Sequence, residues 1–331
     1  MNDIVFFRSI QRTAITPSFA ATPLNTAHHN ARTGVWLAVS GYGLWGIFPL
    51  YFLLVKEVPA SEVLAHRIVG ACILLMAIML ITRRWSKLRQ DITGINRLGL
   101  YLLTAIVLSG NWVAYIWAIQ HERILETSLG YFINPLTSVM LGLMFLGERL
   151  RRRQWYAVGL AGLGVGISIA LFGTIPWVAL WLAGSFSIYS LLHKKYRMPA
   201  LEGLMIETAL ITPLALWWFG HLVAAGQSAT MTADWRLMTP LLAAGVVTIL
   251  PLLLFLQAMH HLRMVTIGLL QYIAPSLQFA IGIAMGEPFG WVQAATFGLI
   301  WLALAVFTHD ALNHARRIAK KPSRTPPVTT V

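Results

Sequence analysis

The stretches PASEVLAHRIV (59–69) and PALEGLMIETA (199–209) lie 140 residues apart and share a proline followed three positions later by a glutamate. Shifting the whole sequence by the same 140 residues, without a gap, aligns further residues: His121 with His261, Arg123 with Arg263, Pro135 with Pro275 and Gly142 with Gly282. The matches of Pro, His, Arg and Glu are informative because these residue types are scarce in so apolar a chain. The sequence therefore predicts an internal duplication, and an ancestral duplication that is kept only for packing is the alternative to one that serves the function.

Composition indicates the solvent in which this repeat folds. The chain has 331 residues, of which 57% are hydrophobic and 11% are charged, and its mean hydropathy is +0.67. A soluble domain carries roughly 25% charged residues, so this composition predicts a protein embedded in lipid. It excludes a disordered chain, a secreted disulfide scaffold and most soluble enzymes. The one cysteine, Cys72, excludes an internal disulfide and a cysteine metal cluster.

Ten apolar segments are close to the length of about 20 residues that a membrane-spanning helix needs. They are residues 34–55, 61–82, 98–119, 125–146, 154–171, 177–192, 202–223, 240–259, 264–285 and 291–310. Each half of the duplication holds five segments, and an odd number turns the second copy upside down in the bilayer. We therefore predict an all-α integral membrane protein with ten transmembrane helices in two inverted five-helix repeats, residues 34–172 and 173–312. Inverted repeats are typical of secondary transporters, which alternate access around a central site.

The basic residues predict how the helices are oriented. With the N-terminus inside, 21 of the 25 Lys and Arg residues fall on the inner side, three fall outside and Arg67 lies within the membrane. This is the positive-inside pattern, so the net charge of +13 reflects topology rather than nucleic-acid binding. Residues 1–33 lack the apolar core of a secretory signal, and we expect a disordered cytoplasmic tail or a misassigned start codon. Residues 313–331 predict a second, basic cytoplasmic tail.

Two midspan prolines indicate where a cavity lies. Pro135 and Pro275 occupy equivalent positions of the two repeats, and each is expected to break its helix and to free backbone carbonyls near the membrane midplane. An ordinary helix kink is the alternative. Nearby polar and aromatic residues are expected to line a substrate cavity, although helix–helix hydrogen bonds and core packing would use the same side chains. These residues are Asn111, Trp112, Tyr131, Asn134 and Gln271.

Some ionisable residues lie inside the apolar segments, where a charge must face protein or water; Arg67, Glu126 and Glu207 are the most informative of them. Arg67 and Glu126 both fall near the outer surface. We predict that they form an outer pair that gates the pathway or binds substrate, with a static structural pair as the alternative. Glu207 falls toward the inner surface, and serves either as a proton-coupling carboxylate or as an interhelical hydrogen-bond acceptor. The sequence has no Walker loop, metal-ligand spacing or catalytic set, so we expect no metal, no cofactor and no enzymatic activity.

Five motifs resemble the RarD subfamily of the EamA-type permeases, the subfamily of the chloramphenicol-sensitive protein, in the drug/metabolite transporter superfamily. They are EVLAHRIV (62–69), GNWVAYIWA (110–118), ETSLGYFINPL (126–136), MIETALITP (205–213) and LLQYIAPSLQF (269–279). The resemblance runs from about Gly34 to Asp310, and it implies a ten-helix permease of the bacterial inner membrane without an established substrate. The residues at the subfamily's motif positions are His66, Arg67, Asn111, Trp112, Glu126, Tyr131, Asn134, Glu207, Gln271 and Tyr272.

Together these features predict a secondary transporter that works by alternating access, with export as the favoured direction. We expect the substrate to be a small polar or amphipathic metabolite or a drug-like molecule. An uncoupled facilitator or channel on the same fold is the alternative. The expected partners are this small molecule, the lipid bilayer and a coupling proton, with no nucleic acid.

Overall fold

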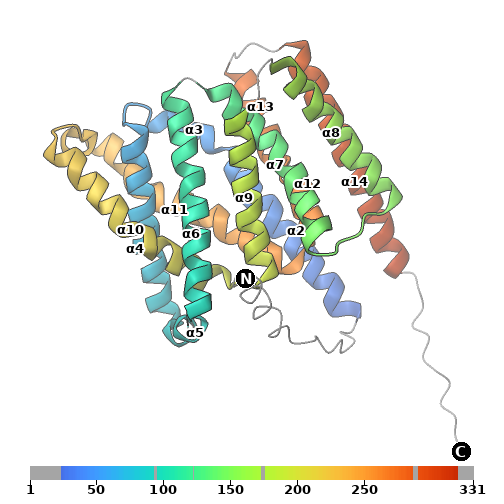
Figure 1. Cartoon of the computed structure of the whole chain (residues 1–331), viewed down its shortest axis with the longest axis horizontal. Coiled ribbons are helices and arrows are strands. Elements are labelled where there is room, and N and C mark those ends of the chain that lie inside the picture. The colour runs from blue at the N-terminus through green and yellow to red at the C-terminus, as the bar shows by residue number, and fades with distance from the viewer. Residues whose placement is uncertain (1–23, 93–94, 122, 173–175, 286–289, 320–331) are drawn as a thin grey trace, which may run out of the picture.

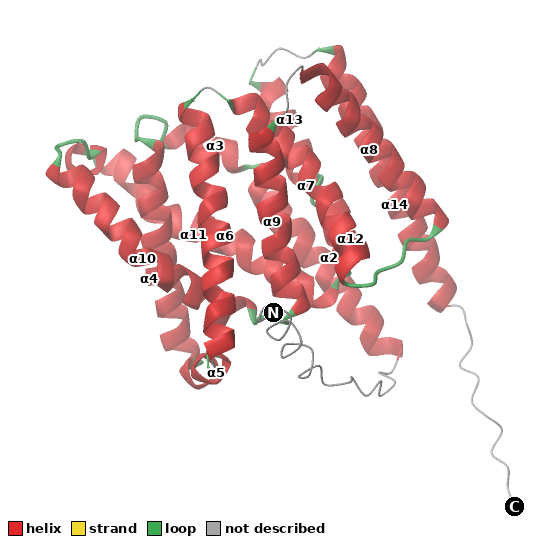
Figure 2. Cartoon of the chain, in the orientation of Figure 1, coloured by secondary structure: helices red, strands yellow, loops and turns green. Residues whose placement is uncertain are grey.

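The structure, a computed structural model, describes residues 24–92, 95–121, 123–172, 176–285 and 290–319. Within these ranges the chain is helical and contains no strand (Figure 2). The helices are α2 (Leu24–Gly46), α3 (Phe48–Leu54), α4 (Ala60–Thr82), α5 (Trp85–Asp91), α6 (Ile95–Gln120), α7 (Ile124–Phe145), α8 (Arg152–Phe172), α9 (Trp177–Lys195), α10 (Ala200–Ala224), the 3₁₀ turn η1 (Ala229–Thr232), α11 (Trp235–His261), α12 (Met264–Leu270), α13 (Ile273–Ala284) and α14 (Trp291–Ala319).

Seven helical stretches among the described residues are long and apolar enough to cross a membrane. They are Ala31–Leu54, Ala60–Thr82, Arg97–Tyr115, Arg152–Leu171, Ala200–Ala224, Trp235–His261 and Met264–Ala284. Two shorter apolar stretches, Leu129–Phe145 and Ala294–Asp310, accompany them. The chain is therefore a multi-pass membrane protein. All ten predicted segments fall on helices, whereas the count of ten spans and the inverted repeat stay predictions.

The helices at the two ends of the described chain are longer than the predicted spans. Helix α2 begins at Leu24, so it includes residues 24–33, which the sequence assigned to a tail, and α14 continues past residue 312 to Ala319. Neither extension contains a proline, and a helix can continue beyond the lipid because water does not break its internal hydrogen bonds. The other tail residues, 1–23 and 320–331, lie outside the described residues.

Prolines interrupt the helices at two of the predicted spans. The ninth segment is divided into α12 and α13 at Gln271 and Tyr272, and Pro275 is the third residue of α13. Proline lacks an N–H group, and its ring displaces the carbonyl four residues earlier, which here belongs to Gln271. The first segment is divided between α2 and α3 in the same way, ahead of Pro49. Helix α7, by contrast, runs without interruption through Pro135, so the break expected there does not occur.

The helices form a bundle with one pair of helices on each of two opposite sides (Figure 1). Helices α8 and α14 pack side by side at one end, and α4 and α10 pack together at the other. Between them, α7 contacts α9 and α12, while α11 contacts both α2 and α4. Helices α4 and α11 approach closely where Gly70 faces Gly245 backbone to backbone. Small residues permit such close helix contacts in membrane proteins.

Helix α8 carries four closely spaced glycines, Gly159, Gly162, Gly164 and Gly166, of which one contacts another helix. A side chain at Gly164 would meet the carbonyl oxygen of Thr296 on α14 at 3.1 Å. The positions Gly159, Gly162 and Gly166 face open space instead. Gly164 is therefore the one of these glycines that brings α8 and α14 together.

Candidate functional site

A cavity of about 140 Å³, called the central cavity below, lies between the helices near the α12–α13 break. It contains most of the residues that the sequence singled out: Arg67, Asn111, Trp112, Tyr131, Asn134, Gln271 and Pro275. The rest of its lining is mainly apolar and aromatic: Tyr42, Trp45, Phe48, Phe52, Leu108, Tyr115, Gly130, Leu182, Phe186, Thr248, Leu252, Ala274 and Gln278. The sequence analysis missed most of these residues, because only their three-dimensional arrangement distinguishes them from the rest of an apolar chain.

Arg67 is the charged residue of this cavity. Its Nε donates a hydrogen bond to Thr248 Oγ1 on α11 at 2.9 Å. Its guanidinium carbon lies 5.8 Å from the ring centre of Phe52 and 5.7 Å from that of Trp112, within the range of cation–π attraction. Among the described side chains, no carboxylate forms an ion pair with Arg67. The predicted partner Glu126 has its side chain outside the described residues, so the Arg67–Glu126 pair stays a prediction.

The two asparagines hold α9 against its neighbours. Asn111 Nδ2 on α6 donates to the carbonyl of Leu182 and to Ser185 Oγ, both at 2.9 Å. Asn134 Oδ1 on α7 accepts a hydrogen bond from Ser187 Oγ at 2.8 Å. Both amides therefore join helices while they line the cavity, so packing and substrate contact are not exclusive roles here.

At the α12–α13 break, the adjacent residues Gln271 and Tyr272 point in different directions. The side chain of Gln271 lines the central cavity and is 8% exposed. Tyr272 points elsewhere, because its hydroxyl donates to the carbonyl of Phe132 on α7 at 3.1 Å. Tyr272 therefore fixes the broken helix to α7, and this contact leaves Gln271 facing the cavity.

His66 lies apart from the central cavity. Its Nε2 is 2.8 Å from Thr230 Oγ1 in the η1 turn, and its ring packs edge-on against Phe219. Neighbouring residues on a helix point in different directions, which explains why His66 and Arg67 face different surroundings. The motif position of His66 therefore contributes to the contact between α4 and the η1 turn.

Glu207 also lies outside the lining of the central cavity. Its side chain is 1% exposed and accepts hydrogen bonds from Thr104 on α6 and from Tyr189 on α9. His193 Nε2 lies 2.7 Å from its Oε1. The sequence analysis missed His193, because its separation from Glu207 crosses a loop and has no helical spacing. Glu207 is thus part of a buried polar cluster between α6, α9 and α10.

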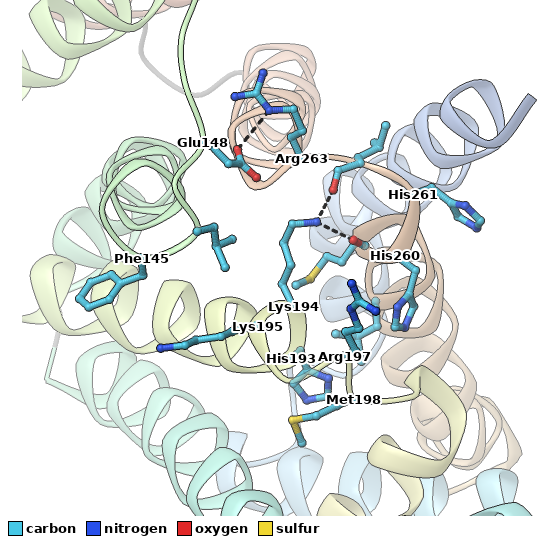
Figure 3. Close-up of a pocket in the computed structure, with 14 residues that line it drawn as sticks. Phe145, Glu148, His193, Lys194, Lys195, Arg197, Met198, His260, His261 and Arg263 are labelled. Atoms are coloured by element: carbon cyan, nitrogen blue, oxygen red, sulfur yellow. Dashed lines mark hydrogen bonds and ion pairs between the residues drawn. The ribbon is translucent and has the colours of Figure 1, made fainter. Parts of the chain in front are cut away.

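A second cavity, of about 830 Å³, opens where α7, α9, α11 and α12 end or begin (Figure 3). We call it the basic cavity, because it is lined by Lys194, Lys195, Arg197, Arg263, His193, His260 and His261 with a single carboxylate, Glu148. The remaining lining residues are Phe145, Leu146, Met198, Leu256, Met259 and Leu262. The sequence analysis attributed these basic residues to membrane topology, and nothing in their spacing indicated a common cavity.

Comparisons with known proteins agree with this architecture. Residues 32–170 match the EamA-like transporter family. The chain is 43% identical to an uncharacterized transporter of Vibrio cholerae, with 88% of this chain and 97% of the relative covered. It is 42% identical to Protein RarD of Escherichia coli (87% and 98% covered) and 31% identical to the chloramphenicol-sensitive protein RarD of Pseudomonas aeruginosa (87% and 97% covered). A solved crystal structure superimposes with a TM-score of 0.62 at 20% identity over 87% of this chain and 99% of the other, which shows a shared fold.

Proposed function

The chain belongs to the RarD subfamily of the EamA-like transporters, and from this premise we propose that it is a secondary transporter that exports a small polar or amphipathic molecule. Relatives that align with this chain over nearly their whole length are named as transporters or as RarD. The excess of Lys and Arg on one side supports an orientation with both termini in the cytoplasm. We place the protein in the bacterial inner membrane, where its relatives' organisms would need such a permease.

The proposed architecture is ten transmembrane helices in two inverted repeats, residues 34–172 and 173–312. It is supported by the alignment of the sequence with itself at a shift of 140 residues. The match of residues 32–170 to the EamA-like family coincides with the first of these repeats. Alternating access then follows from movement of one repeat against the other around a site between them.

The observation that carries the proposal is the composition of the central cavity. Arg67, Asn111 and Tyr131 come from the first proposed repeat, and Thr248 and Gln271 come from the second. A few polar groups that converge on a mainly apolar and aromatic lining are typical of a small-molecule site. A cavity that both repeats line is also the place where a relative movement would change access.

Arg67 indicates which part of a substrate would bind there. A guanidinium offers five N–H donors, and within the described residues one of them has a partner, Thr248. The adjacent rings of Phe52 and Trp112 suit an apolar or planar group beside the charge. We therefore propose that Arg67 binds an anionic group of an amphipathic substrate; a gate formed with Glu126 is the alternative role.

Glu207 is the proposed inner acid for a coupling proton. It is buried, and the titratable groups around it are Tyr101, Tyr189 and His193. A proton bound by the Glu207–His193 pair would change the charge of a cluster that joins α6, α9 and α10, and would thus influence how these helices pack. The alternative, a permanent hydrogen-bond acceptor between helices, uses the same contacts and predicts no pH effect.

The test starts with an untargeted comparison of metabolites inside and outside cells with and without the gene. Each candidate is then examined by counterflow in proteoliposomes with wild-type protein, Arg67→Gln and the control Arg89→Gln, which removes a charge from α5 outside the central cavity. We expect counterflow for wild type and the control, and a loss of at least tenfold for Arg67→Gln. Absence of counterflow for every candidate, despite folded protein, would contradict the proposal. Counterflow without any accumulation of substrate when a proton gradient is imposed would favour the uncoupled facilitator.

A further inference from the structure

The basic cavity carries positive charge that the described residues do not balance. Its lining includes four Lys or Arg side chains and one carboxylate, Glu148. Glu148 is itself engaged, because it accepts hydrogen bonds from the backbone N–H groups of Met264 and Val265 at 2.7 and 2.9 Å, at the start of α12. Its Oε2 also lies 3.7 Å from Arg263 Nε (Figure 3). Among the described residues, no carboxylate forms an ion pair with Lys194, Lys195 or Arg197.

Lys194 shows that the charge is held in place. Its ammonium donates to the backbone carbonyls of Met259, at 2.8 Å, and Leu262, at the end of α11 (Figure 3). Neutral carbonyls fix the position of the ammonium but do not neutralise it. Burial lowers the pKa of Lys194, whereas nearby Glu148 raises it and Arg263 lowers it. A bound anion would offset the cost of this burial, because it would supply the opposite charge.

His193 adds a buried nitrogen that has no partner. Its side chain is 2% exposed and lines the basic cavity. Nε2 faces Glu207, while Nδ1 has no hydrogen-bond partner within the part of the chain that the structure describes. When Glu207 is ionised, Nε2 must keep its proton to bond with it, and a second proton would make Nδ1 a donor. Buried polar atoms are normally hydrogen-bonded, so this nitrogen is an unsatisfied polar atom in the wall of the basic cavity.

The basic cavity lies in line with the central cavity. On α11, Leu252 lines the central cavity and Leu256, one turn later on the same face, lines the basic cavity. On α9, Phe186 lines the central cavity and His193, two turns later, lines the basic cavity. The buried side chains of Tyr189 and Phe255 are packed at the positions between. Two buried aromatic side chains therefore lie at helix positions between the two linings.

We propose that the basic cavity binds an oxyanion group, such as a carboxylate, phosphate or sulfate, on the side of the membrane where the Lys and Arg residues gather. Its role as the entrance to the central cavity rests on the proposed transport function, whereas the binding itself does not. The headgroup of an acidic lipid presents the same chemistry as a soluble anion, and basic pockets between membrane helices bind such headgroups. The charge and the unpartnered nitrogen fit either source.

The test measures binding by the full chain in nanodiscs of phosphatidylcholine, a lipid without net charge. Sodium sulfate is titrated against sodium chloride at equal ionic strength, and thermal unfolding is followed by tryptophan fluorescence. Sulfate keeps its charge across the pH range, so titration of the probe does not complicate the result. We expect a saturable rise in the unfolding temperature at millimolar sulfate.

The variant Lys195→Gln/Arg197→Gln removes two exposed charges of the cavity. Its matched control, Lys87→Gln/Arg89→Gln, removes two exposed charges from α5, outside the cavity. We expect the sulfate affinity to fall at least tenfold in the first variant and to stay within twofold in the control. The single variant Arg197→Gln, with an intermediate loss, serves if the double variant does not fold. Equal responses in all proteins would overturn the proposal, because excluded-salt stabilisation does not depend on these side chains.

A second arm identifies the source of the oxyanion. In nanodiscs that contain one quarter phosphatidylglycerol, loss of the sulfate response indicates that the headgroup fills the cavity, whereas a persistent response indicates a soluble anion. Either result supports oxyanion binding. Because transport is not measured, failure of every counterflow experiment would contradict the proposed function and leave this inference standing. Identical sulfate responses would contradict the inference and leave transport standing.

Discussion

Gly245→Ala tests whether the contact between α4 and α11 positions the charged residue of the central cavity. A Cβ atom at Gly245 would lie 2.3 Å from the carbonyl carbon of Gly70 and 2.5 Å from its oxygen. Gly70 is one turn from Arg67 on α4, and Gly245 is one turn from Thr248 on α11. The same crossing that brings the two glycines together therefore also brings Arg67 Nε within 2.9 Å of Thr248 Oγ1.

The expected size of the effect follows from these distances. Carbon atoms reach ordinary contact at about 3.5 Å, so the two helices must separate locally by about 1 Å. A shift of that size would stretch the Arg67–Thr248 hydrogen bond to about 3.9 Å, beyond the usual range. Overpacking costs about 1–3 kcal/mol and loss of a hydrogen bond to a charged group about 1.5–3 kcal/mol, while alanine gains about 1 kcal/mol of helix propensity. We expect a net destabilisation of about 2–4 kcal/mol.

Equilibrium unfolding in mixed micelles, followed by tryptophan fluorescence and circular dichroism, measures this change. Gly162→Ala is the matched control, because it is also inside a helix but a side chain there would meet nothing within 4 Å. We expect the control to be as stable as wild type or up to ~1 kcal/mol more stable. If Gly245→Ala unfolds with the wild-type free energy, within about 0.5 kcal/mol, the proposed dependence of the Arg67 position on this glycine contact is wrong.

Three further predictions concern the proposed transport. Arg67→Lys is expected to retain less than a tenth of the wild-type counterflow, because an ammonium cannot reproduce a planar guanidinium between aromatic rings; full activity would contradict anion binding by Arg67 in this geometry. Glu207→Gln is expected to remove the pH dependence of counterflow while the protein stays folded, and an unchanged pH profile would exclude proton coupling at this residue. In a Cys72→Ser background, cysteines introduced at Lys87 and Arg197 are expected to react with an impermeant maleimide from the same side of the membrane, and labelling from opposite sides would contradict the inverted topology.

Helix positions could be predicted from the sequence because the signal is additive over many residues. Each apolar segment sums the transfer free energy of about 20 side chains, so single polar residues do not obscure it. The boundaries and interruptions depend on local detail. Pro275 is preceded by a break and Pro135 is not, although both are preceded by similar sequence. The identity of the residue therefore did not decide which of the two prolines interrupts its helix.

Part of the site could be predicted from the sequence. The rest could not, because the sequence does not give the direction in which each side chain points. Arg67, Asn111 and Gln271 were singled out because polar residues in lipid need partners, and the structure places all three around one cavity. Their role in transport stays a prediction. Sequence alone did not distinguish them from His66 and Tyr272, whose side chains point to other partners. A neighbour on a helix shares its depth in the membrane but not its direction.

The two proposed repeats carry residues of opposite charge at equivalent positions, and this difference determines the charge that faces the central cavity. Arg67 presents its guanidinium to the central cavity, whereas Glu207, which lies 140 residues later, is enclosed by Thr104, Tyr189 and His193. Among the described residues, no carboxylate lines the central cavity, and the one in the basic cavity is engaged by the start of α12. Because field lines concentrate in cavities with low-dielectric walls, we expect both cavities along α9 and α11 to attract anions. A cation would meet unfavourable charge at each cavity, so the proposed transport is expected to favour an anionic substrate over a cationic drug.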